Sequence, residues 1–402
     1  MSQQPHTLTH LAPFAHFGTD AIHAGQTPDK YSGAVITPIS LSSTFAQVSP
    51  GVHYPGHYEY ARTANPTRDA FEGCVAALEN GKYACAFSSG LGCTTTLLHL
   101  LKAGDHVISV DDVYGGTGRY FRQVASKFTL EFSFIDLNKE DEFKNAVRPD
   151  KTNMIWLETP TNPTLRITDI ERVHQWRKQY CPEAILIVDN TFMSPYFQRP
   201  LDFGADIVMH SVTKYLNGHS DVVMGVCATA NEELYKRIKY LQNSMGAIPS
   251  PFDSFLALRG LKTLHVRMRQ HQEAAIAVAQ FLEHHPKVAK IVYPGLKAHP
   301  QYDIALKQQT GFGGMVTFWI KGGIAQARQF LENLKVFQLA ESLGGVESLV
   351  NHPAIMTHAS VPVEMRQKLG IDDTLIRLSC GIEDVEDLIK DLETAFSRVT
   401  LE

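Results

Sequence analysis

Two charged residues, a lysine and an aspartate, follow apolar runs in the middle of this chain. Asp189 closes the run 184–188, and Lys214 comes after the run 205–209, inside the segment Ser-Val-Thr-Lys-Tyr at 211–215. Such runs predict buried strands, and ligands of open α/β sheets bind beyond the carboxyl ends of the strands. A lysine that forms a Schiff base, with an acid that keeps a pyridine nitrogen charged, is what a pyridoxal-phosphate site requires. Taken singly, each residue is more often a solvated lysine or a capping aspartate, so the pair needs support from other segments.

A glycine-rich segment, Phe-Ser-Ser-Gly-Leu-Gly-Cys-Thr-Thr at 87–95, is a candidate phosphate site. It leads from an expected strand into an expected helix, and backbone amides at a helix start bind phosphate. The alternative is the nicotinamide-binding turn of a dehydrogenase, with Gly90 and Gly92 as its first two glycines and an aspartate about twenty residues later. Thr95 at the third small position weighs against that alternative. A dehydrogenase would also leave the lysine and the aspartate without a role.

Three further segments carry residues suited to a pyridoxal-phosphate site. Tyr114 follows the apolar run 105–110 and precedes two glycines, so its ring can lie flat against a planar cofactor. Asn162 lies in a loop stiffened by prolines and can donate to a ring oxygen. Ser211 and Thr213 offer hydroxyls to a phosphate. Turns commonly contain such residues, so each signal is modest by itself.

The elements expected to position these residues alternate between about residues 67 and 260. Short apolar runs are separated by helical patterns, which is the rhythm of a parallel sheet with helical crossovers. Right-handed crossovers leave the loop after each strand on a shared rim. The expected strands are 83–87, 105–110, 132–135, 153–157 and the runs that end at 189 and 210; the expected helices are 67–80, 93–101 and 170–179, the last capped by Thr168.

This pattern predicts an N-terminal arm at 1–62, a large α/β domain at 63–260 and a smaller α+β domain at 261–402. The arm is rich in Pro, His, Gly and Tyr and has few periodic segments. Ordering its backbone costs on the order of 1–2 kcal/mol per residue, which a segment without its own core hardly recovers alone. We therefore expect a neighbouring subunit to support the arm. The smaller domain is expected to contain a helix from 260 to 285 and the strands 289–293, 315–320 and 375–378.

Composition limits the class of protein. Of 402 residues, 44% are hydrophobic and 20% are charged, as expected for a folded protein with a large core. A formal charge of −5 without Lys/Arg-rich runs argues against nucleic acid as a partner. No apolar stretch approaches the roughly 18 residues that span a bilayer, and a signal peptide is not evident, which favours the cytosol and no membrane partner. The six cysteines form no C-x-x-C pair and the 18 histidines no H-E-x-x-H, so we expect reduced core thiols and no metal site.

Together these segments resemble the Cys/Met-metabolism family of pyridoxal-phosphate enzymes, which have the aspartate-aminotransferase type of fold (fold type I). The resemblance covers nearly the whole chain. One departure is Val212, at a position where the family usually has a small residue. The motifs are Tyr-x-Arg-x-x-Asn-Pro-Thr at 60–67, Ser-Gly-Leu at 89–91, Asp-x-x-Tyr-Gly-Gly-Thr at 111–117, Glu-Thr-Pro-x-Asn-Pro at 158–163, Asp-Asn-Thr at 189–191 and Ser-x-Thr-Lys-Tyr-x-x-Gly-His at 211–219.

The resemblance implies how pyridoxal 5′-phosphate would be held. Lys214 would bind its aldehyde, and Asp189 would pair with its pyridine nitrogen. Tyr114 would stack on the ring, and would act as an acid or base if the cofactor's charges lowered its pKa. Tyr60 and Arg62 would reach the phosphate of a neighbouring subunit, within a homotetramer built from two active-site dimers. The other cofactor-binding residues it implies are Gly90, Leu91, Asn162, Thr191, Ser211 and Thr213.

For the substrate, the resemblance implies that Arg377 clamps the α-carboxylate with its planar guanidinium. Glu341 and Ser342 would lie near the substrate, with Glu341 at its distal end, and Arg119 is a weaker candidate for a distal carboxylate. Gly116 stands where methionine γ-lyases typically carry a cysteine, which counts against that activity. The substrate set is completed by Asn162 and Tyr60.

Within the family the chain most resembles the cystathionine γ-lyases, through runs such as 190–197. That resemblance implies α,γ-elimination of L-cystathionine to L-cysteine, 2-oxobutanoate and ammonia, with H2S release from cysteine as a further activity. Cystathionine γ-synthase and cystathionine β-lyase stay open as alternatives. All of these enzymes would share the lysine and its acid, so selectivity has to lie in the pocket wall.

Overall fold

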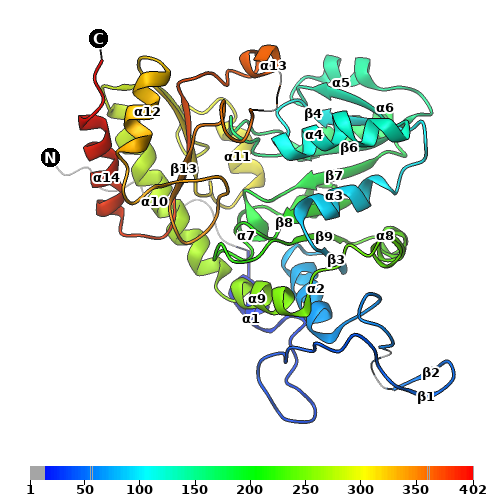
Figure 1. The fold of residues 1–402 in the computed structure, drawn as a ribbon. Helices are drawn as coiled ribbons and strands as arrows, with labels where there is room; N and C mark the ends of the chain where they lie inside the picture. The colour runs from blue at the N-terminus through cyan, green and yellow to red at the C-terminus, as the bar shows by residue number, and fades with distance from the viewer. Residues whose placement is uncertain (1–13, 55, 57, 360, 362, 402) are drawn as a thin grey trace.

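The chain folds around two β-sheets connected by a long helix (Figure 1). In a computed structural model, residues 14–54, 56, 58–359, 361 and 363–401 are described, and residues 1–13, 55, 57, 360, 362 and 402 lie outside that part. The connecting helix, α10 (Leu264–His284), contacts α7 (Ser194–Phe197) of the large domain and the sheet of the smaller one.

The larger sheet has seven strands in the order β3-β9-β8-β7-β6-β4-β5. All run parallel except β9, which is antiparallel to both of its neighbours. The mostly parallel α/β sheet predicted from the sequence is therefore confirmed, while β9 was not predicted. The strands are β3 (Tyr83–Phe87), β4 (His106–Val110), β5 (Glu131–Ile135), β6 (Thr152–Glu158), β7 (Ile185–Asp189), β8 (Ile207–Ser211) and β9 (Gly225–Thr229).

The central strands of this sheet are buried on both faces, which is why they read as continuous apolar runs. Every residue of β4 is buried, and Trp156 of β6 packs edge-on against Phe121 with ring centroids 5.6 Å apart. Helices cover the two faces (Figure 1). The strand ends are consequently fixed by a well-packed core, and the loops beyond them start from defined positions.

Two helix starts differ from those predicted. The helix after the glycine-rich segment begins at Gly90 rather than at residue 93, because Ser89 caps it. The cap of α6 is Asp169 and not Thr168: the Asp169 side chain accepts from the Arg172 amide at 3.0 Å. The helices of this domain are α2 (Pro66–Leu78), α3 (Gly90–Leu98), α4 (Gly115–Gln123), α5 (Glu140–Ala146), α6 (Ile170–Tyr180), α7, α8 (Glu232–Met245) and α9 (Pro251–Leu261), with 3₁₀ turns η1 (Ala125–Phe128) and η2 (Pro200–Phe203).

The smaller domain has a five-stranded sheet in the order β10-β11-β14-β13-β12. Its pairs are antiparallel except β12 with β13, two short strands that were not predicted. Helices α10 and α14 pack together, and the rings of Phe396 and Phe330 are in contact in the domain core, with their centroids 4.5 Å apart. The elements are β10 (Val288–Val292), α11 (Tyr302–Gln308), β11 (Met315–Ile320), α12 (Ile324–Glu332), β12 (Gln338–Leu339), β13 (Leu349–Asn351), α13 (Val363–Lys368), β14 (Leu375–Ser379) and α14 (Val385–Ser397).

The region predicted as an arm has two different parts. Helix α1 (Phe17–His23) packs on α2 of the same chain, and its Phe17 is buried. The stretch that follows extends away from the body (Figure 1) and contains the short hairpin β1 (Gln47–Ser49) and β2 (Val52–His53). Its apolar side chains are open to solvent, Tyr31 at 97% and Leu41 at 74% exposure. The first thirteen residues of the predicted arm lie outside the described part.

Candidate functional site

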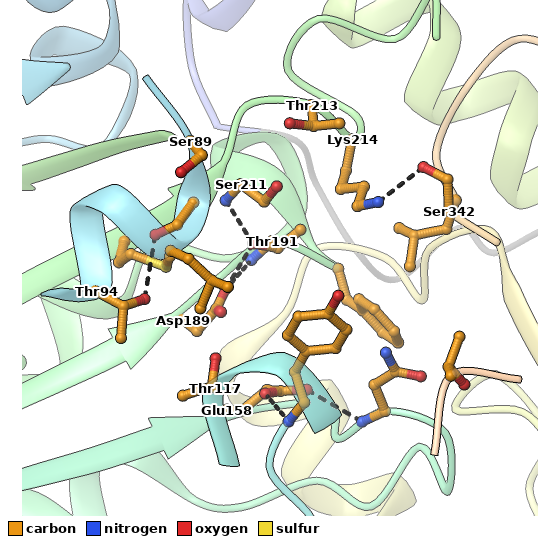
Figure 2. A pocket seen from close by; sticks show the side chains of 18 of the residues that line it. Ser89, Thr94, Thr117, Glu158, Asp189, Thr191, Ser211, Thr213, Lys214 and Ser342 are labelled. Carbon is orange, nitrogen blue, oxygen red and sulfur yellow. Dashed lines mark hydrogen bonds between the residues drawn. The ribbon is translucent and has the colours of Figure 1, made fainter. Parts of the chain in front are cut away.

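A cavity of about 350 Å³ lies at the carboxyl ends of β6, β7 and β8, beside the N-terminus of α3 (Figure 2). Residues 341–343 and Arg377 from the smaller domain close its other side. Most of the predicted site residues line this one cavity. They are Gly90, Leu91, Tyr114, Asn162, Asp189, Thr191, Ser211, Thr213, Lys214, Glu341, Ser342 and Arg377.

The start of α3 forms one end of the cavity. The Ser89 side chain caps the helix by accepting from the Gly92 amide at 2.9 Å. The first amides of a helix have no partner within it, so those of Gly90 and Leu91 are available to an anion. A Cβ atom on residue 90 would lie 3.2 Å from the Ser211 Cβ, so glycine lets the helix start approach the strand end. This end of the cavity suits a phosphate.

Asp189 presents its carboxylate to the cavity at the end of β7. Its Oδ1 accepts twice from Thr191, from the hydroxyl at 2.6 Å and from the backbone amide at 3.0 Å. The Thr191 hydroxyl in turn accepts from the Ser211 amide at 2.9 Å. Burial raises the pKa of Asp189, and the hydrogen bonds from Thr191 oppose that rise. The acid is thus held in one orientation against the strand that leads to the lysine.

Lys214 reaches the cavity from the loop after β8, where its Nζ donates to Ser342 Oγ at 2.7 Å (Figure 2). Burial, and then the charge of Arg377, lowers the pKa of Lys214 to about 8. More of this amine is therefore neutral near pH 7 than of an exposed lysine, and the neutral form is the nucleophile. Val212, the departure from the family pattern, packs into the hydrophobic core.

Arg377 is buried in β14 and engaged on two sides. Its Nη1 donates to Asn162 Oδ1 at 2.9 Å and its Nη2 to the Ser342 carbonyl at 2.8 Å. Burial lowers the pKa of Arg377 to about 10, so the guanidinium stays charged at neutral pH. Ser342 has a φ of 100°, which non-glycine residues rarely adopt, and it accepts a hydrogen bond from Lys214 through its hydroxyl and one from Arg377 through its carbonyl. Because Asn162 Oδ1 is used here, its amide nitrogen is left to donate to a ring oxygen.

Glu158 is a cavity residue that the sequence reasoning missed. Its Oε2 accepts from the Tyr114 amide at 2.9 Å and its Oε1 from the Asn162 amide at 3.2 Å, so one carboxyl group fixes two loops relative to each other (Figure 2). Burial, and then the charge of Asp189, raises the pKa of Glu158 well above its ordinary value. The available signal was its position, since it ends an apolar run as Asp189 does.

Tyr114 lies over the cavity with a ring that needs the glycine at position 116. A Cβ atom on Gly116 would lie 2.5 Å from the Tyr114 Cε1. Burial, followed by the charge of Glu341, raises the pKa of Tyr114. The groups of the protein therefore shift this phenol away from an acid–base role, and any lowering has to come from charges on a bound molecule.

Three of the predicted site residues, on α4 and in the arm, do not line the cavity of this chain. Glu341 is exposed and lines the cavity, whereas Arg119 is exposed on α4 and is not among the lining residues. Tyr60 and Arg62 are not among them either. Arg62 Nε donates to Asn243 Oδ1 at 3.1 Å, and its guanidinium lies 5.1 Å from the Tyr60 ring. These three predicted residues therefore stay predictions for an assembled site.

The chemistry of the cavity fits pyridoxal 5′-phosphate. A lysine with a lowered pKa can bind an aldehyde, a buried carboxylate can pair with a ring nitrogen, and a capped helix start can hold a phosphate. Among the described residues, no group of three or more His, Cys, Asp and Glu is placed to hold a metal ion. Within the same part of the chain, none of the helices has the length and apolar character needed to cross a membrane.

Comparison with known proteins agrees with a pyridoxal-phosphate site in this cavity. The model of the "Cys/Met metabolism PLP-dependent enzyme" family matches residues 18–397. A cystathionine γ-lyase of Dictyostelium discoideum is 63% identical over 381 residues, 95% of this chain and 97% of that protein. The structure of a Lactobacillus plantarum cystathionine γ-lyase complexed with L-serine is similar with a TM-score of 0.91 and 44% identity, covering 95% and 99% of the two chains. A Xanthomonas oryzae pv. oryzae cystathionine γ-synthase in complex with aminoacrylate and cysteine has a TM-score of 0.91, 45% identity and coverage of 95% and 97%. The predicted fold type I is confirmed by these matches.

Proposed function

We propose a function from the premise that this chain belongs to the Cys/Met metabolism family of pyridoxal-phosphate-dependent enzymes. The function is that of a cystathionine γ-lyase, in which L-cystathionine and water give L-cysteine, 2-oxobutanoate and ammonia. The observation that carries it is the convergence of Lys214, Asp189 and Arg377 on one cavity whose far wall includes Glu341. The high identity to a cystathionine γ-lyase over nearly the whole chain supports the same reaction.

The cofactor would be held by groups from several elements. Lys214 would take its aldehyde, Asp189 its pyridine nitrogen, and the start of α3 with Ser211 its phosphate. When bound, pyridoxal phosphate withdraws electrons from the substrate's α-carbon and stabilises the negative charge that develops there. The further cofactor contacts in the proposal are Tyr114, Asn162, Thr191 and Thr213.

The protein's own groups would orient the substrate and move its protons. Arg377 would bind the α-carboxylate through two parallel hydrogen bonds, which fixes the α-carbon relative to Lys214. The amine of Lys214, neutral in part because of its lowered pKa, would take the α-proton and return protons along the substrate chain. Ser342 Oγ, 2.7 Å from Nζ, would hold the amine between these transfers.

Selectivity for the γ-carbon–sulfur bond would come from the wall around Glu341. In this proposal the Glu341 carboxylate would meet the ammonium group at the distal end of cystathionine. Arg119, which does not line the cavity, would reach the distal carboxylate only once the substrate is bound. Methionine γ-lyases typically carry a cysteine at the position of Gly116. A side chain there would collide with the Tyr114 ring as it is oriented in this structure, so Gly116 counts against that activity. A γ-synthase is the second candidate, supported by the similarity to the Xanthomonas oryzae enzyme. Release of H2S from cysteine is included as a side reaction of the same site.

The proposal includes a homotetramer of two active-site dimers. The arm exposes Tyr31, Val35 and Leu41, apolar side chains that a second subunit would cover. The same contact would bring Tyr60 and Arg62 to the phosphate end of the neighbour's cavity. The predicted cytosolic location belongs to this proposal as well, supported by six buried cysteines that form no disulfide.

The deciding experiment is incubation of the cofactor-loaded protein with L-cystathionine and identification of the products. Cysteine and 2-oxobutanoate in equal amounts are expected. Homocysteine with pyruvate would replace the assignment by a β-lyase. Turnover only when an acylated homoserine and cysteine are supplied would replace it by a γ-synthase.

A further inference from the structure

A buried glutamate and a buried histidine form a pair on the side of the large sheet away from the cavity. Glu79 is the C-cap residue that follows Leu78 at the end of α2, and His210 lies in β8; their exposures are 0% and 1%. His210 Nε2 and Glu79 Oε1 are in direct contact. Neither residue lines the cavity, and neither has a part in the mechanism described above.

The register of the strands places this pair directly behind the acid. Asp189 of β7 is opposite Met209 of β8, and both line the cavity. Side chains alternate along a strand, so Asn190 and His210 point to the opposite face. There the Asn190 Nδ2 donates to Glu79 Oε1 at 3.1 Å, the oxygen that His210 also contacts. One carboxylate oxygen therefore holds the residue after Asp189 together with the residue before Ser211.

The contacts of Glu79 continue into a chain of side-chain amides that reaches the smaller domain. The Asn190 side-chain Nδ2 donates to the Gln198 carbonyl at 2.7 Å, and the Gln198 Nε2 donates to Asn190 Oδ1 at 2.9 Å. The Gln198 Oε1 accepts from Gln308 and from Gln309, each at 3.1 Å. Buried polar groups that are bonded in this way fix the geometry of the backbone that carries them.

The pair also bears on the charge of Asp189. Burial raises the pKa of this acid, the hydrogen bonds from Thr191 oppose the rise most, and a positive charge on His210 would oppose it further. A buried imidazolium would need a carboxylate partner, and Glu79 is the carboxylate in contact with His210 Nε2. Arg199 is another charged group near Glu79, and the charge of Glu79 raises the pKa of Arg199 against the effect of burial, as the charges of Asp202 and Asp20 also do.

We propose that Glu79 and His210 form a buried carboxylate–imidazolium pair that positions the ends of β7 and β8 and keeps Asp189 ionised for the cofactor's pyridine nitrogen. Both residues are positioning residues, since they act through Asp189 and Ser211. The inference rests on the proposed function only in its cofactor, because any pyridoxal-phosphate reaction that needs a protonated ring nitrogen would depend on the pair.

The test uses the holoenzyme and pyridoxal phosphate labelled with ¹⁵N in the ring, whose NMR shift reports the proton on that nitrogen. In His210→Gln, the amide can still donate to Glu79 but carries no charge. In Glu79→Gln, the oxygen remains as an acceptor but cannot hold an imidazolium. In both variants we expect the ¹⁵N shift to move toward that of Asp189→Asn, the reference for a ring nitrogen without its acid. We expect kcat for cystathionine to fall about tenfold, with KM within about twofold of the wild-type value.

The matched control is Glu72→Gln, which changes another buried glutamate, one that accepts from the Ala86 amide at 2.7 Å away from the cavity. It should leave the ¹⁵N shift unchanged. A wild-type shift in either folded His210→Gln or Glu79→Gln would overturn the proposal, because a purely structural pair would not alter the ring proton. If the variants do not fold, neutron diffraction of the wild-type holoenzyme decides. Deuterium on both ring nitrogens of His210 is expected, and deuterium on one alone would overturn the pair. Products other than cysteine and 2-oxobutanoate would change the reaction assigned but not these outcomes.

Discussion

The strand-end cluster and the arm contribute to the proposed site in opposite ways. Lys214, Asp189 and Arg377 are each held by hydrogen bonds within the chain, on a sheet whose core is closely packed. Tyr60 and Arg62 lie on an exposed segment and do not line the cavity of their own chain. The difference separates two tasks, because the groups proposed for chemistry are preorganised within one subunit, whereas Tyr60 and Arg62, if they bind the phosphate, would depend on a second one.

The largest effect is expected inside the cluster, from Lys214→Ala. Loss of the amine would remove the group proposed to bind the cofactor's aldehyde and to move the α-proton, so kcat should fall by at least about a thousandfold. The visible absorption of the bound cofactor should also disappear. Absorption spectra and steady-state rates with cystathionine measure both effects.

Lys236→Ala is the control, because that lysine is exposed on α8 and, in the described part of the chain, forms ion pairs with Glu232 and Glu233. It should keep the colour and the rate. Retention of the visible absorption and full turnover in Lys214→Ala would mean that the cluster is not the site.

The next effect is expected at the substrate end of the cluster, from Arg377→Lys. A lysine keeps the charge but cannot form two parallel bonds, so kcat/KM for cystathionine should fall by about 30-fold, or about 2 kcal/mol. Affinity for the cofactor should change little, because Arg377 bonds to Asn162 and Ser342 rather than to the phosphate end. Parallel titrations with the substrate and with pyridoxal phosphate separate these two affinities. An equal loss in both would indicate a general distortion of the cavity.

The arm should show a smaller effect that depends on assembly. Arg62→Ala should weaken pyridoxal phosphate by about tenfold, the effect of losing a charged contact to a phosphate. Mixing and reassembling inactive Lys214→Ala with a strongly impaired variant of both Tyr60 and Arg62 should restore about a quarter of the wild-type activity, because half of the random dimers contain one intact site. If no activity is recovered, Tyr60 and Arg62 do not act in the cavity of a neighbouring subunit: they either act in the cavity of their own subunit or have no part in the reaction.

Local sequence patterns predicted some elements of the fold correctly and missed others. Asp189 was expected at a strand end because the apolar run before it is continuous, and β7 ends at that residue. Strand β9 was missed although its residues are apolar, because its antiparallel direction and its place between β3 and β8 depend on contacts with segments far away in the chain. The α6 cap fell on Asp169 instead of Thr168 because both are capping residues, and only the backbone conformation chooses between neighbours.

The buried polar contacts behind the cavity were beyond local patterns. Glu79 and His210 are separated by 131 positions in the chain, so neither reads as the other's partner. Glu158 bonds two backbone amides, which are groups that every segment contains. In contrast, Asp189 and Lys214 of the strand-end cluster follow strands of the large sheet, and the fold class itself brings such strand ends together. The sequence therefore predicted the residues proposed to contact ligands more readily than the residues that hold them in place.

The smallest effect is a pH shift within the cluster, and it tests how Lys214 is activated. Burial and then the charge of Arg377 lower its pKa to about 8, so binding of pyridoxal phosphate to the cofactor-free protein should become faster as pH rises through 8, where the amine loses its proton. Arg377→Met removes that positive charge, and the midpoint should move to higher pH, toward the ordinary value of lysine. Arg377→Lys keeps the charge and should leave the midpoint in place. Stopped-flow measurement of cofactor binding across this pH range distinguishes the two variants, and an equal midpoint in both would mean that burial alone sets the pKa of Lys214.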